Sequence, residues 1–237
     1  MKMKKLLVLA LCLVTIASIS VVATLAYFTD NDSVTNTFTV GKVGIKLDEA
    51  KTNEYGVEVE GADRVQGNEY KAIPGHVYVK DPTVTVEKDS EASYIRMLVT
   101  VNNIDVFAEG CPETDFADFG AGKVFLLENY VTGWDEAQWP CVSATIDADG
   151  KVCSYEFRYY QTVSTVGAAV DKALEPLFTH ITMPGTLNND QIAKLNDLEI
   201  NVVAQAIQAD GFGDDAEKAW AAYETQVETN PNSTPNP

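Results

Sequence analysis

Short runs in which apolar and polar residues alternate recur along this 237-residue sequence, and they constrain its fold more than any other feature. The clearest run is 95–101, in which every second residue is a large apolar side chain: Ile95, Met97, Val99 and Val101. Comparable runs occupy 43–47, 55–59, 84–86, 142–146, 152–160 and 198–207. Side chains at every second position line one face of a strand, so each run predicts a β-strand with one buried face.

Turn residues separate these runs, for example Asp147-Ala148-Asp149-Gly150, which predicts a hairpin. Many short strands joined by turns indicate an all-β-dominated chain, a jelly-roll-like β-sandwich with a few short decorating helices. Asn189 is placed to cap one short helix, and the spacing of Asp214 and Glu217 resembles a capping box ahead of an amphipathic helix. The run 198–207 is expected to form a central strand.

Residues 1–26 have the layout of a secretory signal peptide. Three lysines precede an apolar run from Leu6 to Val22, and small residues follow, which predicts cleavage between Ala26 and Tyr27. The apolar run is also close to the lower length limit of a membrane-spanning helix, so an uncleaved anchor is the alternative. Cleavage would leave a strand pattern almost at the new N-terminus, with Phe28, Val34, Phe38 and Val40 on one face.

The junction T-L-A-Y-F-T-D (24–30) and the following N-T-F-T-V-G-K-V-G-I-K-L (36–47) resemble the secreted TasA/camelysin-like family. Signal peptides of that family are cut by a SipW-type signal peptidase. Internal segments at 81–87, 94–101, 176–184 and 204–212 resemble the same family. The resemblance implies a sandwich fold, secretion to the extracellular matrix or cell surface of a Gram-positive-type bacterium, and self-assembly into a biofilm-matrix fibre. The implied partners are further copies of the chain, the peptidase and co-secreted matrix proteins.

The expected organisation is a signal peptide (1–26), an N-terminal strand segment (27–41), a β-sandwich domain (42–228) and a disordered tail (229–237). The strand segment has two possible partners. It either begins the sheet of its own sandwich or acts as a donor strand in an open groove of the next subunit, where its four apolar side chains would fill pockets. The resemblance favours donor-strand exchange.

Acidic residues dominate the charge. Removing residues 1–26, which carry three lysines and no acidic residue, changes the formal net charge from −18 to −21. Such a chain lacks the basic face that nucleic acids require, and it is poorly suited to anionic membrane surfaces after cleavage. Nucleic acid and membrane are therefore excluded as partners of the mature protein.

The mature chain keeps three cysteines, Cys111, Cys141 and Cys153, an odd number for an oxidising compartment. We expect one disulfide and one free thiol. A turn closed by residues 147 and 150 would place Cys153 opposite Ala144, so that Cys141 and Cys153 lie on opposite faces. Cys111 is therefore expected to be one partner of the disulfide, with either of the others as the second.

No motif of catalysis or metal binding is present at the required spacing. His76 and His180 lie far apart in the sequence, and neither belongs to an H-E-x-x-H pair. We therefore predict a structural protein without catalytic residues, metal or cofactor. Two alternatives are kept: a divergent camelysin-like secreted metallopeptidase, because camelysin-like proteins have been classed as metallopeptidases, and a monomeric surface protein that shares only the export route.

Overall fold

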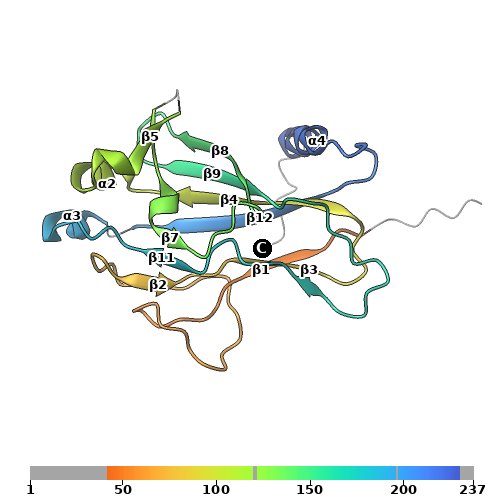
Figure 1. The fold of residues 1–237 in the computed structure, drawn as a ribbon, viewed down its shortest axis with the longest axis horizontal. Coiled ribbons are helices and arrows are strands. Elements are labelled where there is room, and N and C mark those ends of the chain that lie inside the picture. Colours follow the sequence, from red (N-terminus) through yellow and green to blue (C-terminus); the bar gives the residue numbers. More distant parts are fainter. Residues whose placement is uncertain (1–41, 120–121, 196, 230–237) are drawn as a thin grey trace, which may run out of the picture. The chain divides into compact units, whose positions relative to one another are not determined.

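The computed structural model of the protein describes residues 42–119, 122–195 and 197–229 (Figure 1). The chain divides into two units between residues 40 and 41, and all described residues belong to the second unit. The predicted signal peptide, its cleavage position between Ala26 and Tyr27, and the donor-strand residues Phe28, Val34, Phe38 and Val40 lie outside the described residues. So does the predicted tail beyond Thr229.

Within the described ranges the chain forms twelve strands, three α-helices and two short 3-10 turns. The strands are β1 (Ile45–Asp48), β2 (Val77–Val79), β3 (Thr83–Val86), β4 (Ser93–Val101), β5 (Phe116–Asp118), β6 (Lys123–Phe125), β7 (Val131–Thr132), β8 (Cys141–Ile146), β9 (Cys153–Arg158), β10 (Lys172–Ala173), β11 (His180–Thr182) and β12 (Ile200–Gln208). The helices are α2 (Ile104–Gly110), α3 (Asn189–Lys194) and α4 (Ala216–Thr229).

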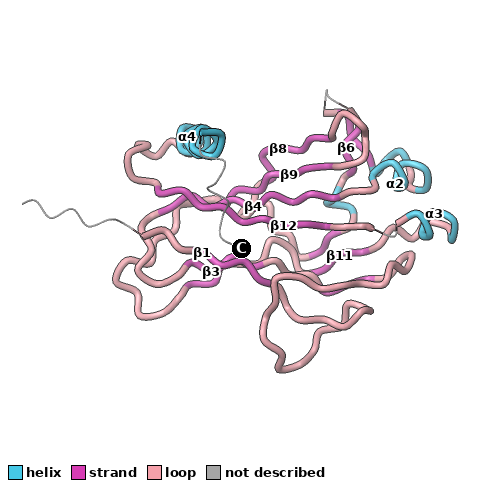
Figure 2. Tube along the Cα trace, turned by 180° about the vertical axis from the view of Figure 1, so that it is seen from behind, coloured by secondary structure: helices cyan, strands magenta, loops and turns pink. Residues whose placement is uncertain are grey.

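The strands form four antiparallel sheets, of which the largest has the order β12-β4-β9-β8. The smaller sheets are β1-β3-β10, β2-β11-β7 and the pair β5-β6. The hydrophobic core joins the inner face of β4 to side chains of β3 and β9, and Val84, Val86, Met97 and Val99 have no exposed surface. The predicted all-β sandwich with a few short helices is therefore confirmed (Figures 1 and 2).

Helix α4 packs on the outer face of the large sheet, at the end of the strands opposite to α2 and α3 (Figure 1). The buried guanidinium of Arg96 in β4 lies 4.3 Å from the ring centre of Trp220 and 5.3 Å from that of Tyr223. It also donates hydrogen bonds to the carboxylate of Glu224 and, at 2.7 Å, to Gln205. This contact fixes the helix to the sheet by stacking and ion pairing together.

Two expectations about strands were wrong. The run 55–59 is a loop, because the side chain of Asn53 accepts hydrogen bonds from the N–H groups of Tyr55 and Val57 and Gly56 adopts a positive φ of 68°. The run 198–207 does form a strand, β12, but this strand is at the edge of its sheet and not at the centre. Alternation reports which faces of a strand are buried and not whether both edges are paired.

The hairpin between β8 and β9 forms as predicted, but its register differs by two residues. Asp147 N–H donates to the carbonyl of Val152, and the Asp147 carboxylate accepts from the N–H groups of Lys151 and Val152. This side-chain capping lengthens the turn, so Cys153 pairs with Ile146 and not with Ala144. Helix α4 likewise begins one residue later than expected, with the carboxylate of Asp215 accepting from the N–H of Lys218.

Candidate functional site

The open edge of β12 is the feature from which a candidate site can be built. Two backbone hydrogen bonds, one at each end of β12, show which of its residues bond to β4. Asn102 N–H donates to the carbonyl of Glu199 at 3.3 Å, and Ala209 N–H donates to the carbonyl of Ala92 at 2.7 Å. Alternate residue pairs exchange hydrogen bonds in an antiparallel ladder, so the odd-numbered residues of β12 face β4. The even-numbered residues, from Ile200 to Gln208, direct their N–H and C=O groups to the opposite side. No backbone hydrogen bond from the described part of the chain reaches them there.

The same even-numbered residues carry the apolar inner side chains of β12. Ile200, Val202, Ala204 and Ala206 pack against the core but stay only half-buried, whereas their counterparts in β4 are almost completely buried. A half-buried apolar strand whose outward backbone groups have no partner among the described residues can bind an additional strand, although β1 lies close to part of it.

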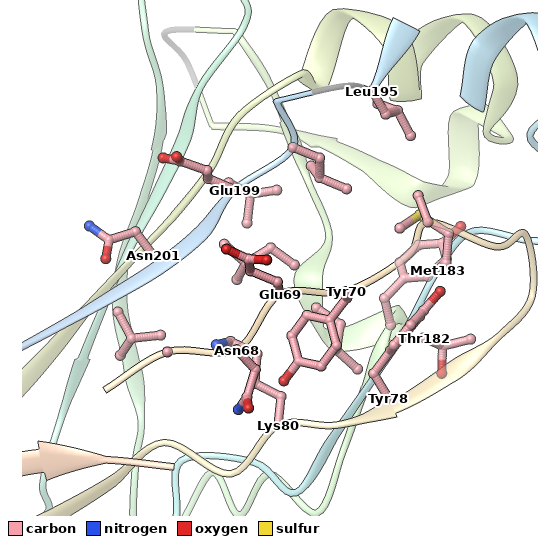
Figure 3. Close-up of a pocket in the computed structure, with 18 of the residues that line it drawn as sticks. Asn68, Glu69, Tyr70, Tyr78, Lys80, Thr182, Met183, Leu195, Glu199 and Asn201 are labelled. Atoms are coloured by element: carbon pink, nitrogen blue, oxygen red, sulfur yellow. The ribbon is translucent and has the colours of Figure 1, made fainter. Parts of the chain in front are cut away.

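A cavity of about 950 Å³ lies beside this edge (Figure 3). One wall is the segment 197–202, which leads into β12 and includes Glu199 and Asn201, and the facing wall is the segment 66–70, which includes Glu69 and Tyr70. Apolar side chains contributed by β1, β11 and the segment after α3 complete the lining, among them Leu47, Ile181, Met183 and Leu195. The cavity thus extends this edge of β12 into a groove lined by both apolar and polar side chains.

One cluster of polar side chains in the lining is held by mutual hydrogen bonds. Lys80 Nζ lies 2.7 Å from Glu49 Oε2, and the amide of Asn68 donates to Glu49 Oε1 at 2.9 Å. The side chains of Lys80 and Glu49 are only 9% and 6% exposed. Tyr70 donates its hydroxyl hydrogen to the carbonyl of Val79, and burial together with the nearby Glu49 carboxylate raises the pKa of Tyr70 to about 12. The cluster therefore presents a fixed, electrically neutral set of donors and acceptors at neutral pH.

A second opening of about 540 Å³ lies at the other edge of the large sheet, beside β8, and includes the exposed side chains Phe119 and Val142. Strand β8 has six residues and an irregular register between Cys141 and Ser143, where two of its residues oppose one of β9. A bulge of this kind twists an edge and weakens pairing with a further strand. The nine-residue β12 has an uninterrupted register, so we favour its edge as the site.

The three cysteines and the two histidines of the described residues lie in different surroundings. None of the three cysteines is bonded to another in the structure: Cys111 is half-buried, Cys141 is exposed and Cys153 is buried. The expected disulfide stays a prediction. His76 Nε2–H donates to the carbonyl of Tyr55, and the His76 ring packs edge-on against Tyr78, while His180 contacts the hydroxyl of Thr179. Within the described ranges, no group of three or more His, Cys, Asp or Glu side chains is arranged to hold a metal ion.

Sequence reasoning predicts a donor segment and an open groove in the next subunit, but it does not say which residues form the groove. Lys80 and Glu49 are separated by 31 residues, and nothing in their sequence neighbourhood indicates that they pair. The sequence shows only that Lys80 and Glu49 each end an extended run, and this is a weak indication that they pair.

No protein-family model matches this sequence, and comparison with curated proteins and with solved structures returns no match either. None of the helices among the described residues has the length and apolar character needed to cross a bilayer.

Proposed function

We propose that the chain is a secreted structural subunit of an extracellular fibre, in which residues 28–40 of one copy add a strand to the free edge of β12 in the next copy. The fibre would belong to the biofilm matrix or cell surface of a Gram-positive-type bacterium. Its formation would require a SipW-type signal peptidase to release the strand, and co-secreted matrix proteins would join it. The resemblance to the TasA/camelysin-like family supports this proposal.

The observation that carries the proposal is the edge of β12, which has no strand partner within residues 42–119, 122–195 and 197–229 and lies beside the cavity of about 950 Å³. A strand laid along this edge would form backbone hydrogen bonds with Ile200, Val202, Ala204 and Ala206, whose polar groups point outward. Its inward side chains would complete the half-buried core at the same residues. The 13-residue segment 28–40 is long enough to cover all nine residues of β12.

Contacts of this kind generate a filament without further assumptions. The donor strand and the acceptor edge are different surfaces of the same chain, so the interface is heterologous and each added copy leaves one free edge. The formal charge of −21 on each mature copy makes neighbouring subunits repel one another, so added salt should promote assembly by screening this repulsion.

The decisive experiment uses the mature chain, residues 27–237, and compares it with a variant that lacks 27–37. We expect the deletion variant to be a folded, soluble monomer that forms no filaments in electron micrographs or sedimentation. Replacing both Val34 and Phe38 by aspartate should have nearly the same effect, because both side chains would enter the groove.

Aspartate at both Thr35 and Thr39 is the matched control, since it adds the same charge on the opposite face of the strand. This control should assemble almost normally. If the deletion unfolded the domain, the segment would belong to its own sheet. If the deletion variant or the Val34 and Phe38 variant assembled like the wild type, strand exchange would be wrong.

A further inference from the structure

The Lys80–Glu49 pair has unused hydrogen-bonding capacity that faces the cavity. A lysine ammonium carries three donors, and Lys80 Nζ makes one hydrogen bond within the part of the chain that the structure describes. The Glu49 carboxylate accepts one hydrogen bond at each oxygen, although each can accept another. Asn68 is saturated as a donor, because its amide serves both Glu49 and the carbonyl of Ala50. Lys80 and Glu49 can therefore each form a further hydrogen bond with a group that enters the cavity.

Such an incompletely satisfied buried pair is unfavourable unless another group completes it. Two charges removed from water lose hydration, and their mutual attraction offsets that loss only when their remaining donors and acceptors are also satisfied. Lys80, Asn68 and Tyr70 lie together on one side of the cavity, across from Glu199 and Asn201 (Figure 3). The pair is thus placed where an incoming strand would lie against β12.

The N-terminal segment carries one side chain that suits this pair. Asn36 has the same parity as Val34, Phe38 and Val40, so it must enter the groove whenever these neighbours do. A buried amide without partners is strongly disfavoured, and the Lys80–Glu49 pair offers it both a donor and an acceptor. The amide oxygen can accept from Lys80 Nζ while the amide nitrogen donates to Glu49, which would give Lys80 and Glu49 one further hydrogen bond each.

Charge selects Asn36 over the two aspartates of the same parity, Asp30 and Asp32. Lys80 is already neutralised by Glu49, and Glu69 and Glu199 line the same cavity. An additional carboxylate would be repelled by these carboxylates, whereas an amide adds no charge.

We propose that, in the fibre, the side-chain amide of Asn36 binds the Lys80–Glu49 pair of the next subunit and thereby fixes the register of the incoming strand. This inference rests on the proposed strand exchange. A shift by one residue would turn every apolar side chain out of the groove. A shift by two would place Val34 or Phe38 on the charged pair and leave its donors unsatisfied.

The first test measures the critical concentration for assembly of the mature chain by sedimentation. Asn36→Leu should raise it about tenfold or more, because the variant leaves the buried pair without its partner. Thr37→Leu, which adds the same side chain on the opposite face, is the matched control and should change it less than about twofold. In a background carrying Lys80→Met and Glu49→Gln together, Asn36→Leu should no longer impair assembly.

The second test needs no substitution in the groove. Filaments are assembled from equal parts of a copy with ¹³C-labelled asparagine and a copy with ¹⁵N-labelled lysine. We expect an intermolecular solid-state NMR contact between an asparagine side-chain carbonyl and a lysine Nζ, and we expect this contact to vanish in Asn36→Gln filaments.

The outcomes separate this inference from the fibre proposal. If the wild-type mature chain forms no filaments, the fibre proposal itself fails, and the inference fails with it. If filaments form and depend on residues 27–37, but Asn36→Leu assembles like Thr37→Leu, only the register inference is overturned. The same holds if Asp32→Asn impairs assembly while Asn36→Leu does not, because Asp32 would then be the partner of Lys80.

Discussion

The free edge of β12 can be tested directly with a proline that blocks it. Ala204 is near the middle of the strand, and its N–H points away from β4, so Ala204→Pro removes no hydrogen bond of the existing ladder. In a fibre the same N–H would bond to the donor strand. Its loss removes one hydrogen bond and leaves a buried carbonyl of the donor unpaired, which together cost about 2 kcal/mol.

A change of about 2 kcal/mol corresponds to roughly a thirtyfold higher critical concentration. Ala144→Pro is the matched control, because Ala144 occupies the corresponding outward position on β8, at the opposite edge of the same sheet. Both variants should unfold within about 4 °C of each other, since both place proline on an edge strand. Sedimentation and thermal unfolding measure the two quantities. Normal assembly of Ala204→Pro, or equal impairment of Ala144→Pro, would refute the assignment of β12 as the acceptor edge.

N-terminal sequencing of the secreted protein should give Tyr27 as the first residue, and a start at Met1 or well past Val34 would contradict the export model. Trp220→Ala should lower the free energy of unfolding by about 3–5 kcal/mol and detach α4, which calorimetry and a limited-proteolysis time course would detect. Hydrogen bonds from the N–H groups of Val152 and Lys151 lower the pKa of Asp147, so this carboxylate stabilises the fold above pH ~4 and loses that effect as the pH falls further. Asp147→Asn should therefore flatten the dependence of Tm on pH below ~4, and an unchanged slope would show that the carboxylate is not responsible. Pure protein should show no zinc-dependent proteolysis that alanine at His76 or His180 abolishes, as a chelator-controlled casein assay can determine.

The sequence was sufficient to predict the core strands because their alternation is strict. In β4 and β9, residues at period two are buried on one face, and both strands lie inside a sheet. The loop around Gly56 was misread as a strand because Tyr55, Val57 and Val59 alternate by coincidence and are all exposed. The hydrogen bonds that the Asn53 side chain accepts from Tyr55 and Val57 decide the conformation there, and a periodicity count does not include them.

The position of the groove could not be predicted, because it depends on which edge strand has no second partner strand among the described residues. The residues of β12 alternate much like those of β4, yet among the described strands β4 has a partner on both sides and β12 has one. Whether a strand has one neighbour or two follows from long-range topology, which period-two alternation does not encode. The Lys80–Glu49 pair depends on the same topology, since β1 and β2 bring its two members together at one side of the cavity.

The bulge at Cys141 and Ser143 has a consequence for the geometry of the proposed polymer. A subunit with one strand to give and two equivalent edges to receive would produce branch points, and the assembly would grow into a gel and not a thread. The irregular register of β8 breaks that equivalence, which leaves β12 as the favoured acceptor. A single-residue irregularity in one edge strand would then decide whether growth continues in one dimension.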